Sequence, residues 1–243
     1  MIALFKKEIS VFFSTLIGYL IIGSFLLINS LLLWSDFSNM NILSYGYADM
    51  DIFFATAPLF FLLFIPAISM RMFTEEFTAG TIETLVTKPI TSLQIVLGKF
   101  FAVFILILFT ILPTLIYVVS IYYLGESIGN LDLAGIMGSY IGLIFLCALF
   151  TAISIYASSV ASNQIISFVL AILLNFLFYF GFDLLSEISF FQNIDLIVQK
   201  IGISFHYEMM SKGLIKLSDI IYFLSFTFLF IKLTELVVVD RRS

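Results

Sequence analysis

Charged residues are scarce in this 243-residue chain. Lysine and arginine together number 11 and aspartate and glutamate 16, so charged residues make up 11% of the sequence, against about 25% in a soluble domain. Hydrophobic residues reach 62%, against the usual value of about 45–50%. A globular fold of this size has no interior large enough for 30 phenylalanines and so much leucine and isoleucine. Lipid is the solvent that fits, and we expect an all-α polytopic membrane protein in a bilayer.

Other absences exclude chemistry. The single cysteine, Cys147, rules out an internal disulfide and a cysteine-based metal cluster, and the single histidine, His206, argues against a histidine-based metal site. A Walker A loop needs G-x-x-x-x-G-K-[ST], and the one Gly-Lys pair, Gly98-Lys99, lacks both the first glycine and the final Ser/Thr. Ser204 lies two residues before His206, a spacing that suits an intramembrane serine protease poorly. We expect no catalytic residue, no metal and no bound cofactor.

The few charges mark where hydrophobic runs end, because a charge at mid-bilayer costs about 2.5–3.5 kcal/mol. The runs predict one domain over 1–243 with six transmembrane helices, and an interfacial helix at 2–13 before them. That opening segment could instead be a basic flank of the first span. The predicted spans are about 15–34, 52–72, 99–124, 136–158, 165–183 and 220–239.

The segment 184–217, between the last two spans, is amphipathic. Apolar residues recur in it at intervals of three to four, with polar residues between them. It could lie in the outer interface, or form a small lid packed on the helix ends. In the fourth span, small residues four apart form a ridge that lets a helix approach closely, within the subunit or between subunits. These candidates are Gly138, Gly142, Ala148 and Ala152.

Lysine and arginine predict the orientation, since they gather on the cytoplasmic side of membrane proteins. Six spans place both termini on one side with residues 71–99. That side carries eight basic residues: Lys6, Lys7, Arg71, Lys88, Lys99, Lys232, Arg241 and Arg242. The other side carries three, Lys200, Lys212 and Lys216. We therefore expect both termini in the cytoplasm and a multi-pass location in a bacterial inner membrane. No nucleic-acid partner is expected.

One polar segment separates the second and third spans, where residues 71–92 read RMFTEEFTAGTIETLVTKPITS. Three glutamates, Glu75, Glu76 and Glu83, fall within nine residues. The segment is some twenty residues long, whereas a plain connector needs only a few. We interpret residues 73–98 as a cytoplasmic elbow that docks a soluble partner. The alternative is a solvated connector.

Helix-breaking residues give this elbow a predicted shape. Helical spacing continues past the second span until Gly80 breaks it. Pro89 ends a second, short helix, and Thr91 with Gln94 predicts a capping box that opens the third span. The apolar face of the short helix consists of Ile82, Leu85 and Val86.

The run MRMFTEEFTAGTIETLVTKPITSLQIVLGKF resembles the cytoplasmic elbow of ABC-2-type transporter permeases, where E-E-x-x-x-G-T-x-E-x-L-x-x-x-P-I recurs. Its positions are occupied by Glu75, Glu76, Gly80, Thr81, Glu83, Leu85, Pro89 and Ile90. The six spans and the long segment before the last one are also similar to that family. More finely, EISVFFSTLIGYLIIGSFLLIN, FLLFIPAISMRMFTEE and FTAISIYASSVASNQIISF resemble the permease subunit of the gliding-motility-associated ABC transporter of Bacteroidota.

The resemblance implies a permease subunit of an ATP-driven exporter whose substrate is unknown. Two permease subunits, identical or different, would pair, and each would dock a separate ABC ATPase that binds ATP and magnesium. A gliding-motility transporter would add an auxiliary subunit. The implied coupling residues are Glu75, Glu76, Gly80, Thr81, Ile82, Glu83, Leu85, Val86 and Pro89. The competing hypothesis is a membrane scaffold that recruits a cytoplasmic partner and transports nothing.

Overall fold

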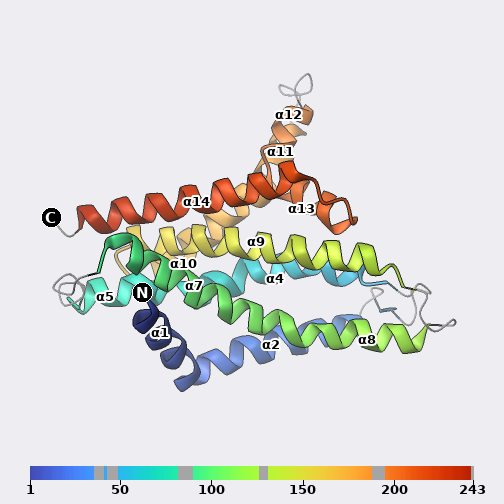
Figure 1. The fold of residues 1–243 in the computed structure, drawn as a ribbon, viewed down its shortest axis with the longest axis horizontal. Helices are drawn as coiled ribbons and strands as arrows, with labels where there is room; N and C mark the ends of the chain where they lie inside the picture. Colours follow the sequence, from blue (N-terminus) through green and yellow to red (C-terminus); the bar gives the residue numbers. More distant parts are fainter. Residues whose placement is uncertain (36–40, 43–48, 82–89, 126–130, 188–194, 242–243) are drawn as a thin grey trace.

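The computed structural model describes residues 1–35, 41–42, 49–81, 90–125, 131–187 and 195–241, and every regular element in these ranges is helical. The helices run mostly along one axis and form an elongated bundle (Figure 1). The longer ones are α2 (Leu16–Trp34), α4 (Asp51–Ser69), α7 (Ser92–Ile111), α8 (Leu115–Leu124), α9 (Leu133–Val160), α10 (Gln164–Phe176) and α14 (Leu217–Asp240). The shorter ones are α1 (Ile2–Ser14), α5 (Arg71–Thr78), a 3₁₀ turn η1 (Leu112–Thr114), a π segment η2 (Leu177–Gly181), α11 (Phe182–Ser186), α12 (Asp195–Gln199) and α13 (Ile203–Ser211).

Five helical stretches of the described chain are long and apolar enough to cross a membrane: Asp51–Thr78, Ser92–Leu124, Leu133–Val160, Gln164–Ser186 and Leu217–Asp240. A sixth span would join α1 to residues 18–34 of α2, two stretches that are bent by 69°. The predicted all-helical membrane fold is therefore confirmed, with the bent pair deciding between five spans and six.

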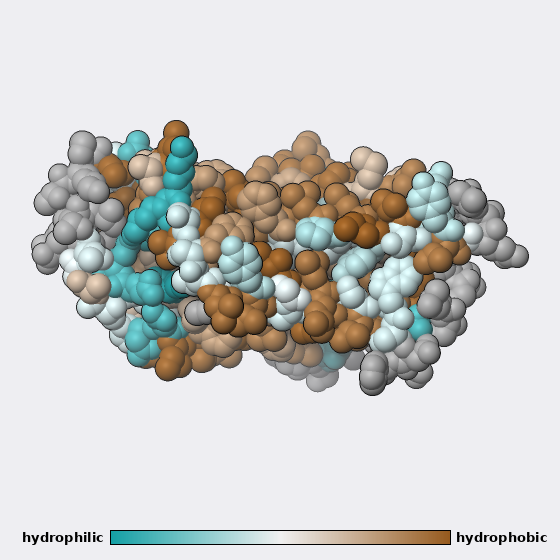
Figure 2. Space-filling view, turned by 90° about the horizontal axis from the view of Figure 1, so that it is seen from below, coloured by the Kyte–Doolittle hydropathy of each residue, from teal (hydrophilic) through white to brown (hydrophobic). Residues whose placement is uncertain are grey.

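The bundle has two ends, called here the elbow end and the far end. The elbow end contains α5, the start of α7 and the end of α9, and the far end contains the start of α4, the end of α8 and the start of α9 (Figure 1). Figure 2 shows hydrophilic residues gathered near the elbow end and a largely hydrophobic surface between the two ends. Such a surface suits lipid around the middle of the bundle.

Helix α7 begins at Ser92, directly after the predicted capping residue Thr91, and so extends ahead of the predicted span at 99–124. The predicted capping box forms: Thr91 Oγ1 accepts from Gln94 N at 3.3 Å, and Gln94 Oε1 accepts from Thr91 N at 3.3 Å. The box starts the helix before the bilayer run begins. As a consequence Lys99, expected at the boundary of the span, lies inside the helix and is buried.

Helix α9 lies at the centre, packed against α4, α7, α10, α13 and α14. Most of its side chains are buried, among them Leu143, Leu146, Cys147, Phe150 and Ile153. Asp132 caps its start by accepting from Gly135 N at 3.0 Å. It ends at Val160, between the predicted spans 136–158 and 165–183, and Asn163 caps the start of α10 by accepting from Ile166 N at 2.9 Å.

A proline interrupts the regular helix of the third span. Pro113 lies in the 3₁₀ turn η1 between α7 and α8, at the bend that its missing N–H favours.

Of the segment predicted at 184–217, residues 188–194 lie outside the described chain. Helices α11 and α12 project from the bundle, whereas α13 packs on α9 and buries Tyr207 and Met210 (Figure 1).

Candidate functional site

Helix α5, the first part of the predicted elbow, is contacted by side chains from five other helices or their caps. It continues the direction of α4 after a break at Met70, and the two together form one candidate span. The contacts combine ion pairs, hydrogen bonds and a stacked cation. The contacting residues are Lys7 of α1, Lys99 of α7, Ser158 of α9, Gln164 at the start of α10 and Arg241 at the end of α14.

A buried cluster of ionisable side chains joins three of these helices. Lys99 is 1% exposed, and its Nζ lies 3.0 Å from Glu76 Oε1 of α5 and 3.3 Å from Glu8 Oε1 of α1. It also donates to the carbonyl of Met72 and lies over the Phe73 ring. A buried ammonium is tolerated because two carboxylates and a carbonyl replace its water.

Lys7 completes the cluster from its outer side. Its Nζ lies 3.4 Å from Glu76 Oε1 and 3.6 Å from Glu8 Oε1, and its side chain is half exposed. The two carboxylates therefore meet two ammonium groups, so the cluster has no formal net charge. The buried side of α1 carries Leu4, Glu8 and Phe12, so Glu8 lies among apolar side chains on the face that meets the bundle. Ile2, at the start of the same helix, is 66% exposed.

The break between α4 and α5 is bridged by a hydroxyl from α9. Ser158 Oγ accepts from Phe73 N at 3.0 Å and donates to Met70 O at 3.0 Å. Thr74 Oγ1 also donates to Met70 O, at 2.6 Å. A side chain inserted into a helix in this way replaces the backbone bonds that the break removes. The end of α9 is thereby fixed to the point where the second span becomes the elbow.

The structure separates the glutamates of the elbow motif. Glu75 is exposed and accepts from Gln164 Nε2 at 3.2 Å, whereas Glu76 is 6% exposed and faces the cluster. Gly80 has φ +66°, the left-handed conformation that glycine adopts most easily, and it ends the helical path as predicted. Thr81 follows it, exposed. The other predicted coupling residues, Ile82, Glu83, Leu85, Val86 and Pro89, lie outside the described residues.

The cluster itself was not foreseen from the sequence. Lys99 and Glu8 are 91 residues apart, and the charge pattern placed Lys99 at the boundary of the third span. One signal was available: a capping box at Thr91 places Lys99 two turns inside a helix, where a charge in an apolar chain needs a partner. Nothing in the sequence said which carboxylate that partner is.

The predicted small-residue ridge of α9 packs against the chain's own α13 and the turn after it. A Cβ on Gly138 would lie 2.8 Å from Gly213 Cα, and one on Gly142 would lie 2.9 Å from Met210 Cβ. Farther along α9, Ala148 packs against the core and Ala152 is buried. At the glycines, the close approach lies within one subunit.

The residues considered for chemistry make other contacts. Ser204 Oγ donates to Asp183 Oδ2 at 2.5 Å. His206 Nδ1 lies 2.8 Å from Asp219 Oδ1, and its Nε2 lies 2.9 Å from the carbonyl of Lys200. Serine and histidine are thus engaged with different partners. Among the residues that the structure describes, no group of three His, Cys, Asp or Glu side chains could hold a metal ion.

No curated protein matches the chain. The family described as "ABC-2 family transporter protein" matches residues 8–239, from the buried Glu8 to the end of α14. This match covers nearly the whole chain, and the helical bundle agrees with it. The chain belongs to the ABC-2 family and is a multi-pass membrane permease of an ABC transporter.

Proposed function

We propose that this permease couples ATP hydrolysis by a separate ABC ATPase to movement of its spans, and that the force enters through the elbow. The observation that carries the proposal is the set of contacts on α5 from five neighbours. ATP and magnesium would be bound by the ATPase, and this chain would bind no cofactor. The short helix predicted within 82–89 would be the docking element.

Rigid attachment is what such coupling requires. A push on a flexible loop is absorbed locally, whereas α5 is held by buried ion pairs to α1 and α7 and by Ser158 to α9. Interactions buried away from water are screened little by salt and hold their geometry. A displacement of α5 therefore moves several spans together. Glu75 and Thr81 are among the exposed residues of the described elbow that a docked ATPase could touch directly.

The proposal also covers the orientation in the membrane, the partner subunits and the direction of transport. The excess of lysine and arginine supports a cytoplasmic elbow end and cytoplasmic termini in a bacterial inner membrane. A second permease subunit, identical or different, would complete the transporter, and export is the direction the resemblance implies. The similarity of three sequence stretches supports the gliding-motility subtype, with its auxiliary subunit.

The test begins with purification of the tagged chain from its source cells, where an ABC ATPase should co-purify. The complex is then placed in lipid nanodiscs, and its ATP hydrolysis is compared with that of the isolated ATPase and the isolated permease. We expect the permease alone to hydrolyse nothing, and the complex to hydrolyse faster than the ATPase alone. A tagged chain that retains no ATPase would favour the scaffold hypothesis.

Ser158→Ala is the informative variant, with Ser159→Ala as its matched control. Ser159 is equally buried, but its Oγ donates only within α9, to Tyr156 O. We expect Ser158→Ala to keep the ATPase bound and to lose most of the stimulation, while Ser159→Ala behaves as wild type. A bulky residue at Gly80 or charge reversal at Glu83 should also uncouple hydrolysis. Normal stimulation of ATP hydrolysis in the Ser158, Gly80 and Glu83 variants would contradict coupling through the elbow.

A further inference from the structure

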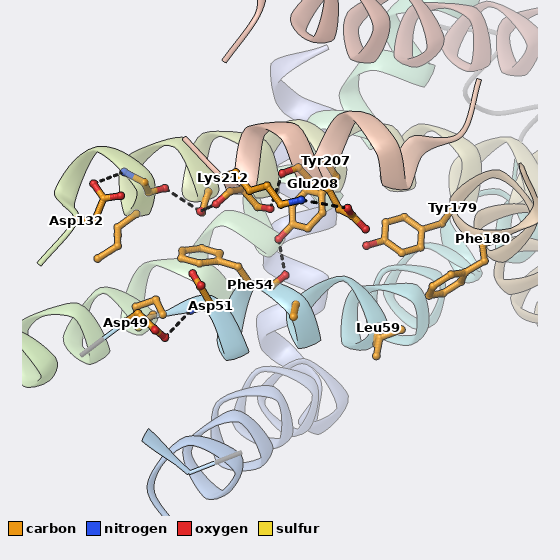
Figure 3. Close-up of a pocket in the computed structure, with 16 residues that line it drawn as sticks. Asp49, Asp51, Phe54, Leu59, Asp132, Tyr179, Phe180, Tyr207, Glu208 and Lys212 are labelled. Carbon is orange, nitrogen blue, oxygen red and sulfur yellow. Dashed lines mark hydrogen bonds and ion pairs between the residues drawn. The ribbon is translucent and has the colours of Figure 1, made fainter. Parts of the chain in front are cut away.

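A cavity of about 610 Å³ opens at the far end of the bundle, between α4, α9, η2 and α13 (Figure 3). Ligand sites in proteins commonly have volumes of about 300–1,000 Å³. Its walls are partly aromatic, with Phe54, Tyr179, Phe180 and Tyr207. One side reaches Leu59, which is 46% exposed on the surface expected to face lipid. The cavity therefore joins a polar helix end to the apolar surface.

Negative charge predominates in this cavity. Lys212 is the one basic side chain among the lining residues, and its Nζ lies 3.7 Å from Glu208 Oε2. The carboxylates number four: Asp49, Asp51, Asp132 and Glu208. Asp132 caps α9 and Asp51 lies in the first turn of α4, so both also have a structural role. Burial, together with the nearby Asp51 carboxylate, raises the pKa of Asp49 above its ordinary value.

A second feature of the cavity, independent of its charges, is the hydroxyl of Tyr179. Tyr179 is 7% exposed, and within the described part of the chain no hydrogen-bond partner is found for its hydroxyl. Figure 3 shows the hydroxyl pointing into the cavity toward Glu208. Its neighbour Tyr207 differs, since that hydroxyl donates to Phe54 O at 2.6 Å. A hydroxyl that opens on a cavity without a protein partner is available to a ligand, and π segments such as η2 are often found at functional sites.

We propose that this cavity binds a primary ammonium group carried on an apolar body. The ammonium would donate to Glu208 and to the Tyr179 hydroxyl, with the ring faces of Phe54 and Phe180 nearby. A cation is favoured both by the excess of carboxylates and by aromatic faces. The apolar body would extend past Leu59 toward lipid. An inorganic cation fits less well, because no three acidic side chains of the described residues converge as metal ligands.

This inference concerns binding by the permease alone and does not depend on ATP-driven transport. The full chain is purified into nanodiscs of phosphatidylcholine, and n-hexylammonium is titrated in by calorimetry. Hexanol and hexanoate are the matched neutral and anionic probes. We expect hexylammonium to bind at least about tenfold more tightly than either, since a charged hydrogen bond contributes more than the ~1.4 kcal/mol that a factor of ten requires.

Two variants test the contacts. Tyr179→Phe keeps the ring and removes only the hydroxyl, and Glu208→Gln removes one exposed carboxylate. Each should weaken hexylammonium binding about fivefold or more. The matched controls are Tyr123→Phe, at the exposed end of α8, and Glu187→Gln, after α11 and outside the cavity, and neither should change it. Equal affinity for hexanol, or unchanged binding in both cavity variants, would overturn the proposal.

A further arm identifies the source of the amine. Nanodiscs that contain phosphatidylethanolamine offer the same ammonium chemistry on a lipid. If a lipid headgroup is the occupant, these discs should lower the apparent affinity for hexylammonium in the wild type. Tyr179→Phe should reduce that competition. Unchanged affinity in these discs would assign the cavity to a free amine.

Discussion

Lys99 shows how much a single residue can organise in this permease. Its ammonium is buried where α1, α5 and α7 meet, within 3.3 Å of two carboxylates. One oxygen of Glu76, Oε2, is buried without a partner among the described residues. The cluster has no formal net charge, but its stability depends on Lys99, the buried cation that contacts both carboxylates. Its loss would leave two carboxylates close together and served only by Lys7.

Replacing Lys99 by methionine should destabilise the protein strongly. Methionine keeps much of the volume but removes the charge, and breaking a buried ion pair costs about 3–5 kcal/mol. The free energy of unfolding, measured in mixed micelles, is the readout. The double variant Lys99→Met with Glu76→Gln should recover part of the loss, because one buried charge is also removed.

Lys232→Met provides the comparison. Lys232 pairs with Glu235 at 2.8 Å but is 44% exposed, so its loss should cost about 0–1 kcal/mol. Equal effects of the two lysine substitutions would mean that the buried cluster contributes no more than a surface pair.

At the scale of elements, close contact between α9 and α13 depends on glycine. Gly138 faces Gly213, whose φ of +78° lets the chain turn after α13. Ser139 Oγ adds a hydrogen bond of 2.7 Å to Ser211 O. The turn approaches through backbone atoms, which cannot move aside as a flexible side chain can.

Gly138→Ala should therefore destabilise the docking of α13. The new methyl group would meet Gly213 Cα at 2.8 Å and Met210 O at 3.0 Å, and overpacking of this kind costs about 1–3 kcal/mol. Limited proteolysis between α12 and α14 should become faster, and the thermal midpoint should fall.

Gly23→Ala is the control for that substitution. No atom lies within 4 Å of a Cβ at Gly23, which is in the middle of α2. Alanine has the higher helix propensity, so this variant should be as stable as wild type or more stable. A loss of stability at Gly23 as large as that at Gly138 would mean that the close approach is not the cause.

For the whole molecule, the orientation in the membrane can be tested with single cysteines. The native Cys147 is buried in α9 and should not react with an impermeant maleimide. Cysteines placed at Lys6 and Thr78, both exposed near the elbow end, should be labelled only after the cells are permeabilised. A cysteine at the exposed Glu187 should be labelled in intact cells.

This experiment also decides the span count. Lys6 lies in α1, ahead of α2, and Thr78 lies at the end of α5, after α4. Labelling of both from the same side requires the pair to cross the membrane once, which gives six spans. Labelling of Lys6→Cys in intact cells would leave five spans and contradict the predicted location of the N-terminus.

Several features were predictable because they depend on local sequence. The capping box at Thr91, the end of the helical path before Gly80 and the division of the long apolar run near residue 160 all follow from neighbouring residues. Charges mark the ends of the apolar runs, whereas capping groups such as Thr91 open helices outside those runs.

The sequence alone determined that this protein is a helical membrane protein, because composition and hydrophobic run length decide which solvent the chain can occupy. Only the tertiary structure decided which charges meet, since Glu8, Glu76 and Lys99 come from three separate helices. It also decided that Glu76 faces inward while Glu75 faces outward, and that Tyr179 points into an acidic cavity. These outcomes depend on how helices rotate and pack against one another, and no short stretch of sequence encodes that.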